Sequence, residues 1–365
     1  MDMKILHNKP TIGQEEITAV VEAMNNLELT KGDRVKLFED VFSKYLGLDS
    51  ISTSSGTSAL HMALCSIGVS KNDQVIIPSY TCVAVGLPII YQQAKPVIVD
   101  VKDDFNISCD NIRKCINDAT KAIIVPHMFG YPADMTDIKE LCVDNGIYLV
   151  EDCSQSIGAI YNGQKVGTLG DISVFSFYAT KMMTSIKGGM VCSSDPDLLE
   201  TVKDLRYHDQ SRSSDDRDMR VKYSYMMSDI EASVGTVQLG KLDSFILRRR
   251  RIAEAYKEGL NCPEIEHPSE ESCKKHVFSR YVIKTPYNPI KLIEQMGGKN
   301  IICERMHAPP LHKRSLFKSF IGSTDFSQTN RIVGSAISLP IYPTLDDDHL
   351  GYVIDSLNEI MGGYK

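Results

Sequence analysis

A serine and a lysine near the middle of the chain have the residue types and spacing for carbonyl chemistry. The apolar run at 172–177 predicts a buried strand, and Ser176 near its end precedes Lys181 by five residues. A lysine just past a buried strand is partly desolvated, which favours the neutral amine that attacks a carbonyl and holds a Schiff base. A surface lysine explains the same spacing, so Lys181 needs support from other residues.

A second candidate is the segment SSGTSAL at 54–60, which follows a short strand and opens a helix. Gly56 lets the backbone approach a ligand closely, while Thr57 and Ser58 offer hydroxyl and backbone N–H groups at the positive end of the helix. This combination predicts a cup for an anion. Serine and threonine before a helix are also ordinary capping residues, so the motif is weak when taken alone.

An acidic residue and an amide follow another buried strand. Asp152 closes the run at 147–152, so its carboxylate belongs at the carboxyl ends of the strands, where α/β proteins bind ligands. Gln155 points the same way if a helical turn begins there. Asp152 alone is explained as a helix cap. Together with the anion cup, Ser176 and Lys181, it completes the groups that would hold the ring nitrogen, ring hydroxyl, phosphate and aldehyde of pyridoxal phosphate.

Seven short β-rich runs position these residues. They are apolar on both faces and alternate with helix-length segments, which predicts an α/β fold with a mostly parallel seven-stranded sheet between helices. The runs are ISTS at 51, QVIIP at 74, PVIVD at 96, KAIIVP at 121, IYLVED at 147, ISVFSF at 172 and GGMVCSS at 188.

Two helices are predicted before the first of these strands. The spacing of apolar residues favours a helix over 11–26, with Thr11 as its cap, and a second helix over 35–46. After the last strand, the polar and charged stretch 211–222 indicates an exposed loop.

A long helix is predicted over 229–256, interrupted near 240–244. It contains the arginine run 248–251, and four successive helical positions cannot face one partner, so at least two of these arginines should face solvent. This helix leads into a smaller C-terminal domain with a strand at 277–285 and helices at 289–297 and 346–361.

The composition is that of a globular metabolic protein. Of the 365 residues, 42% are hydrophobic and 24% charged, and the formal net charge of -7 argues against nucleic acid as a partner. The N-terminus lacks the apolar core of a signal peptide and no run approaches about eighteen apolar residues, so we expect neither export nor a membrane span. The ten cysteines form no CxxC pair and the nine histidines are scattered. We therefore expect reduced thiols, a cytoplasmic location and no metal.

These motifs occur in the order found in the DegT/DnrJ/EryC1/StrS family of pyridoxal-phosphate-dependent sugar aminotransferases, which the chain resembles. The matching segments span nearly the whole sequence: SGTSAL, PSYTCVA, VEDCSQSIGA, GQKVGTLGDISVFSFYATK and LPIYPTL. The resemblance implies a fold-type I transferase of the aspartate aminotransferase-like fold. Its large cofactor-binding domain would cover 1–245 and a smaller α+β domain 246–365. It also implies a homodimer with active sites shared between subunits.

The resemblance implies a role for each matched residue. Lys181 is the lysine that bonds to the cofactor aldehyde and moves protons, and Asp152 pairs with the pyridine nitrogen. Some relatives that deoxygenate sugars carry histidine in place of this lysine, so the lysine here favours transamination over dehydration. The other implied cofactor contacts are Gln155 at the ring hydroxyl, Thr57, Ser58 and Ser176 at the phosphate, and in addition Gly56, Cys82 and Ser224.

Some cofactor contacts depart from the family pattern. Cys82 stands where relatives commonly have an aromatic residue over the cofactor ring, and it offers a smaller and softer contact. Ser224 and Met226 replace an amide and an arginine that the family supplies to the neighbouring subunit's site. The lost guanidinium contact is worth about 1.5 to 3 kcal/mol, and Arg220 or Lys222 are candidate replacements for its charge.

A further departure lies just after the candidate catalytic lysine. Where the family has Gly-Glu-Gly-Gly, this chain has an isoleucine and a lysine before the two glycines, which places Lys187 close to Lys181. We expect Lys181 alone to bond to the cofactor, because only its spacing from the strand-end serine fits.

The resemblance implies that an amino acid, in the first instance L-glutamate, passes its amino group to a nucleotide-linked keto sugar by ping-pong kinetics, in the biosynthesis of amino sugars and polysaccharides. Two alternatives stay open. The acceptor is a cyclitol or another small ketone, or the chain is a pyridoxal-phosphate-binding regulatory protein with little turnover. Candidate substrate contacts are His312, His307 and Arg280, although a structural role explains the histidines equally well.

Overall fold

The computed structural model describes residues 4–208 and 221–363. Most of the loop predicted at 211–222 lies outside these residues. Within the part of the chain that is described, no helix has both the length and the apolar character needed to cross a membrane.

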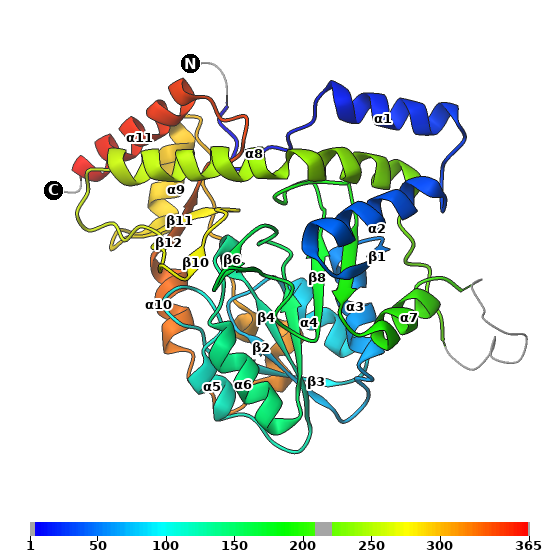
Figure 1. The fold of residues 1–365 in the computed structure, drawn as a ribbon. Coiled ribbons are helices and arrows are strands. Elements are labelled where there is room, and N and C mark those ends of the chain that lie inside the picture. The colour runs from blue at the N-terminus through cyan, green and yellow to red at the C-terminus, as the bar shows by residue number, and fades with distance from the viewer. Residues whose placement is uncertain (1–3, 209–220, 364–365) are drawn as a thin grey trace, which may run out of the picture.

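A seven-stranded sheet forms the centre of the fold, with strand order β1-β9-β8-β5-β4-β2-β3 (Figure 1). Five neighbouring strands pair in parallel, in the order β8, β5, β4, β2 and β3. In contrast, β9 is antiparallel to both of its neighbours, β1 and β8. This confirms the mostly parallel sheet and all seven predicted runs. The strands are β1 (Asp49–Thr53), β2 (Gln74–Pro78), β3 (Lys95–Val99), β4 (Thr120–Pro126), β5 (Tyr148–Asp152), β8 (Ile172–Ser176) and β9 (Gly189–Ser193).

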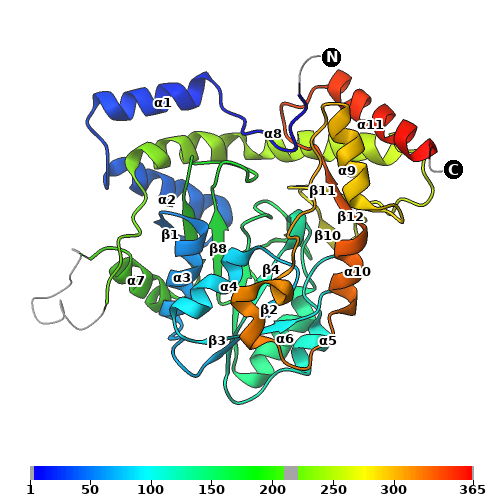
Figure 2. The same ribbon diagram turned by 180° about the vertical axis from the view of Figure 1, so that it is seen from behind.

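Helices cover both faces of this sheet and bury most of its residues. Successive residues of a strand enter different cores, as Leu149 and Val150 do, because side chains alternate across a strand. Figure 1 shows one face and Figure 2 the other. The first face packs against α2 (Asp33–Leu46), α5 (Cys109–Arg113), α6 (Met135–Asn145) and α8 (Asp229–Gly259), and the second against α3 (Gly56–Ser66), α4 (Val83–Tyr91) and α7 (Pro196–Leu205).

The first helix begins later than the sequence indicated. α1 (Gln14–Asn25) has Gly13 as its N-cap, and the side chain of Glu16 accepts a hydrogen bond of 2.7 Å from the Gly13 N–H. The prediction that Thr11 caps this helix is therefore wrong. A carboxylate at the third helical position satisfies the free N–H group instead.

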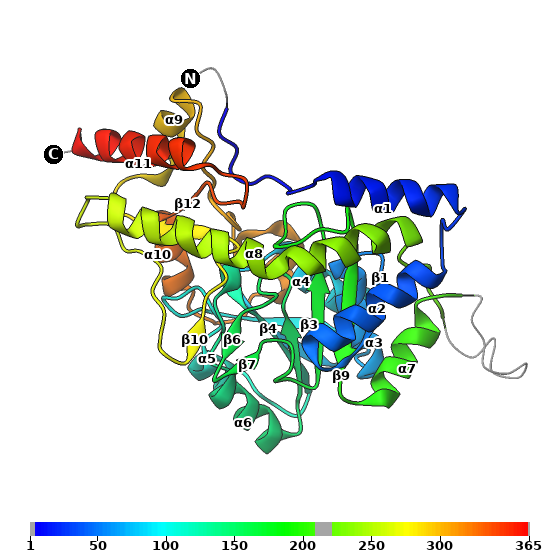
Figure 3. The same ribbon diagram turned by 45° about the horizontal axis from the view of Figure 1, so that its top comes forward.

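The long helix α8 runs without the predicted interruption from the large sheet to the C-terminal elements (Figure 3). Leu242 lies in the stretch expected to break and Phe245 directly follows it, yet both are buried at helical spacing. Lys241 pairs with Glu16 of α1, which ties the two helices together. Packing therefore outweighs the cost of Gly240, which is about 1 kcal/mol relative to alanine in a helix.

The arginine run on α8 divides between solvent and the interior. Arg251 is exposed, while Arg248 and Arg250 are half-buried in ion pairs with Asp347 and Glu270. Arg249 is buried, and burial lowers its pKa to about 9. Its guanidinium donates to the backbone carbonyl groups of Phe278, Ser279 and Ile341.

The C-terminal elements build a separate core. β11 (Tyr281–Lys284) is shorter than the predicted strand and pairs antiparallel with β12 (Ala336–Leu339). Ile5 from the start of the chain packs into the same core. The division of the chain at residues 245 and 246 stays a prediction, and it falls inside α8.

The remaining helices and strands of the described residues are short or lie outside the large sheet. They are α9 (Pro289–Gly298), α10 (Ser327–Ser335), α11 (Asp347–Gly362), β6 (Ile160–Tyr161), β7 (Gln164–Lys165), β10 (Lys274–Lys275), η1 (Met128–Gly130), η2 (Leu311–Lys313) and η3 (Ser315–Phe320).

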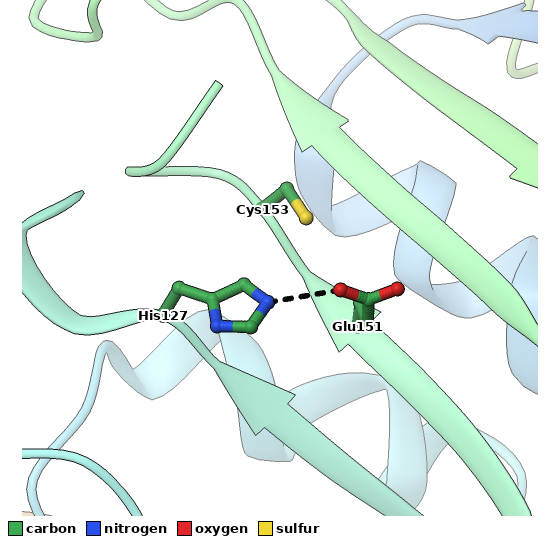
Figure 4. Close-up of side chains that lie close together, drawn as sticks. All are labelled: His127, Glu151 and Cys153. Carbon is green, nitrogen blue, oxygen red and sulfur yellow. Dashed lines mark hydrogen bonds and ion pairs between the residues drawn. The ribbon is translucent and has the colours of Figure 1, made fainter. Parts of the chain in front are cut away.

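A buried carboxylate holds the end of β5 in place (Figure 4). Glu151 accepts a hydrogen bond of 3.1 Å from His127 Nε2, and three backbone N–H groups of the loop 167–170 donate to it at 2.6 to 2.8 Å. His127 Nδ1 accepts from the Ala133 N–H, so Nε2 carries the ring proton. Burial alone would raise the pKa of Glu151, but these donors lower it below its usual value.

Cys153 lies beside this pair. His127, Glu151 and Cys153 are the one set of three metal-ligating side chains that meet in the described residues, with ligand atoms within 4.8 Å of one another. Protein donors already occupy both carboxylate oxygens, and burial holds the pKa of the Cys153 thiol well above its usual value. Hydrogen bonding therefore explains the cluster without a metal ion.

We expect Glu151→Gln to lower the free energy of unfolding at pH 7 by about 3 kcal/mol, because the loop N–H groups lose a buried charged acceptor. The folded-state pKa of Glu151 lies below its unfolded value of 4.5, so the stabilisation is full above that value and disappears as the pH falls through the folded-state pKa. Urea unfolding at several pH values should show the difference from the parent chain shrinking below pH 4.5. Glu140→Gln on the exposed face of α6 is the matched control, and an equal loss there would contradict this role.

Candidate active site

A pocket of about 560 Å³ lies where β5 and β8 end. The start of α3, the turn before α4 and the hairpin between β8 and β9 form its large-sheet side. Residues from the C-terminal half, Ser279, Arg280, Met306 and His307, close the opposite side. The pocket thus occupies the carboxyl end of the sheet, where sequence reasoning placed the ligand.

Lys181 lines this pocket, five residues after the end of β8. The chain folds back on itself here, because the Ser185 N–H donates to the Phe177 carbonyl at 3.0 Å and Met182 and Met183 are buried. Burial lowers the pKa of the Lys181 amine, while the nearby carboxylate of Asp152 acts in the opposite direction. The net decrease favours the neutral amine that carbonyl attack requires.

Asp152 lies at the last position of β5, with 8% of its surface exposed. Its Oδ1 accepts a hydrogen bond of 3.0 Å from the Ser154 N–H, and its backbone carbonyl accepts one of 3.2 Å from the His127 N–H. Gln155 follows and also lines the pocket. Both predicted partners of the pyridine ring therefore face the same space as Lys181.

The first turn of α3 lies against the end of β8. A Cβ atom on Gly56 would come within 2.6 Å of the Ser176 Cβ, so only glycine fits this contact. Gly56, Thr57 and Ser176 all line the pocket, as does Cys82 from the turn before α4. A helix N-terminus with free N–H groups beside two hydroxyl groups suits a phosphate.

Ser58 does not line this pocket. It is the third residue of α3, and its hydroxyl accepts from the Ser55 N–H and donates to the Ser55 carbonyl, both at 2.8 Å. The structure thus gives Ser58 a capping role, the alternative that its position before a helix had left open.

Three side chains from the C-terminal half, those of Ser279, Arg280 and His307, bring unpaired polar atoms to the pocket. The Nε2 atom of His307 is buried and no group in the described residues bonds to it. Burial and the nearby Lys181 and Arg280 lower the pKa of His307 to about 3, so its ring is neutral. Arg280 donates to the carbonyl groups of Thr180 and Ser279, and its buried Nε atom has no partner among the described residues. Buried polar atoms without partners are rare and suit a ligand.

Two other predicted residues lie outside this pocket. His312 shares a hydrogen bond of 2.5 Å with Ser79 and stacks on Phe326 with ring centroids 4.3 Å apart, which is a structural role. Ser224 is exposed and pairs with Tyr207 in an isolated β-bridge. A contact of Ser224 with its own chain's pocket is therefore absent, and its implied contact with a neighbouring subunit stays a prediction.

Several lining residues were not predicted as ligand contacts. Tyr178 and Thr180 face the pocket between the strand end and the lysine, and Met306 faces it beside His307. Lys187 also lines the pocket, although the sequence marked it only as a departure from the family pattern. The positions of Tyr178 and Thr180 follow from the fold of the loop, which periodicity alone does not specify.

The residues present fit pyridoxal phosphate. A close glycine contact leaves room for a phosphate at the start of α3, and a desolvated amine faces a carboxylate across the same pocket. The unpaired atoms on Ser279, Arg280 and His307 remain for a second ligand. Asp152 is the single carboxylate among the described lining residues, so the pocket favours anionic molecules.

Comparisons with known proteins show the family of the chain. Residues 10–358 match the model of the DegT/DnrJ/EryC1/StrS aminotransferase family. GDP-perosamine synthase of Escherichia coli O157:H7 is 32% identical over 96% of this chain and 97% of its own. The aminotransferase TlmJ of Streptoalloteichus hindustanus superposes with a TM-score of 0.92 at 29% identity, covering 99% of both chains.

A second solved structure bears on the cofactor. The putative sugar aminotransferase Spr1654 of Streptococcus pneumoniae, in its PLP-form, superposes with a TM-score of 0.94 at 25% identity over the whole of both chains. The same protein has been solved in a PMP-form. The fold, the family match and these neighbours lead to one conclusion: the chain belongs to the DegT/DnrJ/EryC1/StrS aminotransferase family and is a pyridoxal-phosphate-dependent aminotransferase of fold-type I.

Proposed function

We propose that this enzyme transfers the amino group of an amino acid, L-glutamate, to the keto group of a nucleotide-linked sugar. The observation that carries the proposal is the desolvated Lys181 amine, which shares one pocket with Asp152 and with the first turn of α3. Relatives named GDP-perosamine synthase and dTDP-3-amino-3,4,6-trideoxy-alpha-D-glucose transaminase act on sugars that carry a nucleotide, which supports this acceptor class. A cytoplasmic location stays a prediction from the sequence.

Each lining residue has a role in cofactor binding or proton transfer that follows from its position in the pocket. When bound, pyridoxal phosphate supplies an electron-accepting ring that carries the amino group between the two substrates. Asp152 would keep the ring nitrogen protonated, and Gln155 would bond to the ring hydroxyl. Gly56, Thr57 and Ser176 would bind the phosphate through N–H and hydroxyl groups. The Nζ of Lys181 accepts a proton from the substrate carbon and returns it on the other side of the transfer.

Arg280 and the neutral His307 are suited to substrate binding. The guanidinium is held by two backbone carbonyl groups rather than by a carboxylate, so it is available to the α-carboxylate of the amino donor. His307 can donate or accept a hydrogen bond through its unpaired Nε2 atom, which suits the hydroxyl groups of a sugar. Both side chains come from the C-terminal half, so they approach the cofactor from the side opposite β5 and β8.

The enzyme acts as a homodimer in this proposal. Ser224 is exposed and lies outside its own chain's pocket. The carbonyl of the neighbouring Tyr225, however, accepts a hydrogen bond of 2.8 Å from the Ser54 N–H, beside the phosphate cup that Gly56, Thr57 and Ser176 form. The segment around Ser224 therefore lies at the edge of the cup. From there its exposed side chains can reach a second subunit.

Replacing Lys181 by alanine removes the amine that carries the proton. We expect kcat for transamination to fall by about a thousandfold, which is the usual contribution of a positioned acid–base group. Stopped-flow measurement of the reaction with L-glutamate checks this, and circular dichroism confirms that the fold is intact. Lys44→Ala, an exposed residue of α2, is the control. Full activity in the Lys181 variant would show that another amine does the chemistry.

The substrate assignment is tested by two successive additions. L-glutamate should bleach the visible absorption of the cofactor-loaded enzyme, and a GDP- or dTDP-linked keto sugar should restore it, as ping-pong kinetics require. If only a cyclitol ketone restores the absorption, the chain is a transaminase with a different acceptor. A band that no amino donor changes would contradict the proposal and favour a regulatory protein.

The subunit arrangement is tested in solution. Sedimentation equilibrium should give twice the 40.7 kDa mass of one chain, because each site takes residues from two subunits. A monomer that binds the cofactor with full affinity would rule out the shared site.

A further inference from the structure

Lys187 is a cation at the pocket that the proposed chemistry does not use. It lies in the hairpin between β8 and β9 and lines the same pocket as Lys181. Its side chain is exposed, and in the described residues no carboxylate forms an ion pair with its ammonium group. A lysine ammonium group is a compact point charge on a flexible stem, and it can bind a phosphate.

Hydrogen bonds hold the backbone of this hairpin in one conformation. The Ile186 N–H donates to Thr184 Oγ1 at 2.9 Å, and the Ser185 hydroxyl donates to the Lys187 carbonyl at 2.7 Å. Ile186 has a φ of 68°, which a β-branched residue adopts only where its surroundings impose it. Its exposed side chain makes no core contact that would explain this strain. The strain therefore accompanies the placement of the next residue, Lys187, on the pocket wall.

The hairpin lies directly on the phosphate cup. A Cβ on Gly189 would come within 2.4 Å of the Ser55 carbonyl oxygen and 2.9 Å of the Gly56 nitrogen, so the strand start and the helix start are in contact. Two residues of chain span at most about 7 Å, so Lys187 begins close to this contact. Its flexible four-carbon side chain can cover the remaining distance.

Among the described residues, which do not include the candidate Arg220, the cup itself supplies only neutral donors. Gly56 offers a backbone N–H, and Thr57 and Ser176 offer hydroxyl groups. A phosphate monoester carries a charge of about -1.5 to -2 at pH 7, and a cation makes the strongest hydrogen bond to it. The other lysine of the pocket, Lys181, is needed at the aldehyde, and Lys222 forms an ion pair of 2.6 Å with Asp204.

We propose that Lys187 binds the phosphate of the cofactor and supplies the positive charge that the cup lacks. The proposal rests on the placement of the phosphate at the start of α3, which is part of the proposed function. Lys187 is here a binding residue that leaves proton transfer to Lys181.

The test compares cofactor binding with and without the phosphate. The full-length apoenzyme is titrated with pyridoxal phosphate and with pyridoxal, and the dissociation constants are read from the change in absorbance. We expect Lys187→Gln to weaken binding of pyridoxal phosphate by about tenfold or more, because a charge-assisted hydrogen bond is lost, and to leave the affinity for pyridoxal unchanged. Lys187→Arg should keep most of the affinity, and Lys44→Gln is the control for a lost surface charge.

Each other outcome overturns the proposal. An equal loss for both vitamers would place Lys187 at the ring. An unchanged affinity for pyridoxal phosphate together with a higher KM for a nucleotide-linked sugar would place Lys187 at the substrate phosphates. The proposed function would still stand in that case. Borohydride reduction followed by peptide mapping adds a separate readout, since label on Lys187 in the parent chain would make it the nucleophile. Failure of the parent chain to bind pyridoxal phosphate would contradict the site itself, whatever Lys187 does.

Discussion

The contact between the first turn of α3 and the ends of β8 and β9 sets the dimensions of the active site. Gly56 faces Ser176 and Gly189 faces the Ser55 carbonyl, and in both places a single added Cβ would collide with its neighbour. Glycine at these positions lets a helix N-terminus and a strand end meet without an intervening side chain. The N–H groups of α3 and the Ser176 hydroxyl therefore converge on one point, as phosphate binding requires.

Charged groups inside the fold fall into two classes. Glu151 and Arg249 do not line the pocket and bond mainly to backbone groups of neighbouring loops, so they hold segments of the chain together, although the Nε atom of Arg249 has no partner in the described residues. Arg280 and His307 are placed beside the pocket with a buried nitrogen left unpaired. An unsatisfied buried nitrogen costs stability, and at the pocket a ligand can supply the missing partner.

Sequence reasoning recovered the features that local pattern determines. All seven strands followed from runs that are apolar on both faces. Asp152 was placed at a strand end and Lys181 just past one, because periodicity shows where a buried run stops. Errors arose where a distant partner decides the structure. Gly240 was taken for a break in α8 because the packing of Leu242 and Phe245 is a tertiary effect.

The polar residues show the same limit. Ser58 and His312 were assigned to ligands from their place in motifs, but the first caps its own helix and the second bonds to Ser79, more than 200 positions away. The composition of a motif shows which residues occur together, whereas the direction of each side chain depends on the helix phase and on contacts with remote segments. Lys187 illustrates the converse, since a departure from the family pattern proved to line the pocket.

The balance of charge in the pocket links these observations to stability. Lys181, Lys187 and Arg280 face a space in which Asp152 is the one carboxylate of the described lining residues, and the His307 ring is neutral. Burial lowers the pKa of Lys181 and the positive charge of the nearby Arg280 lowers it further, so gathering these basic groups in one site is electrostatically unfavourable. A phosphate of about two negative charges offsets this excess of positive charge. Cofactor binding therefore relieves a repulsion that folding creates, and the folded state gains stability in proportion to how tightly the phosphate is held.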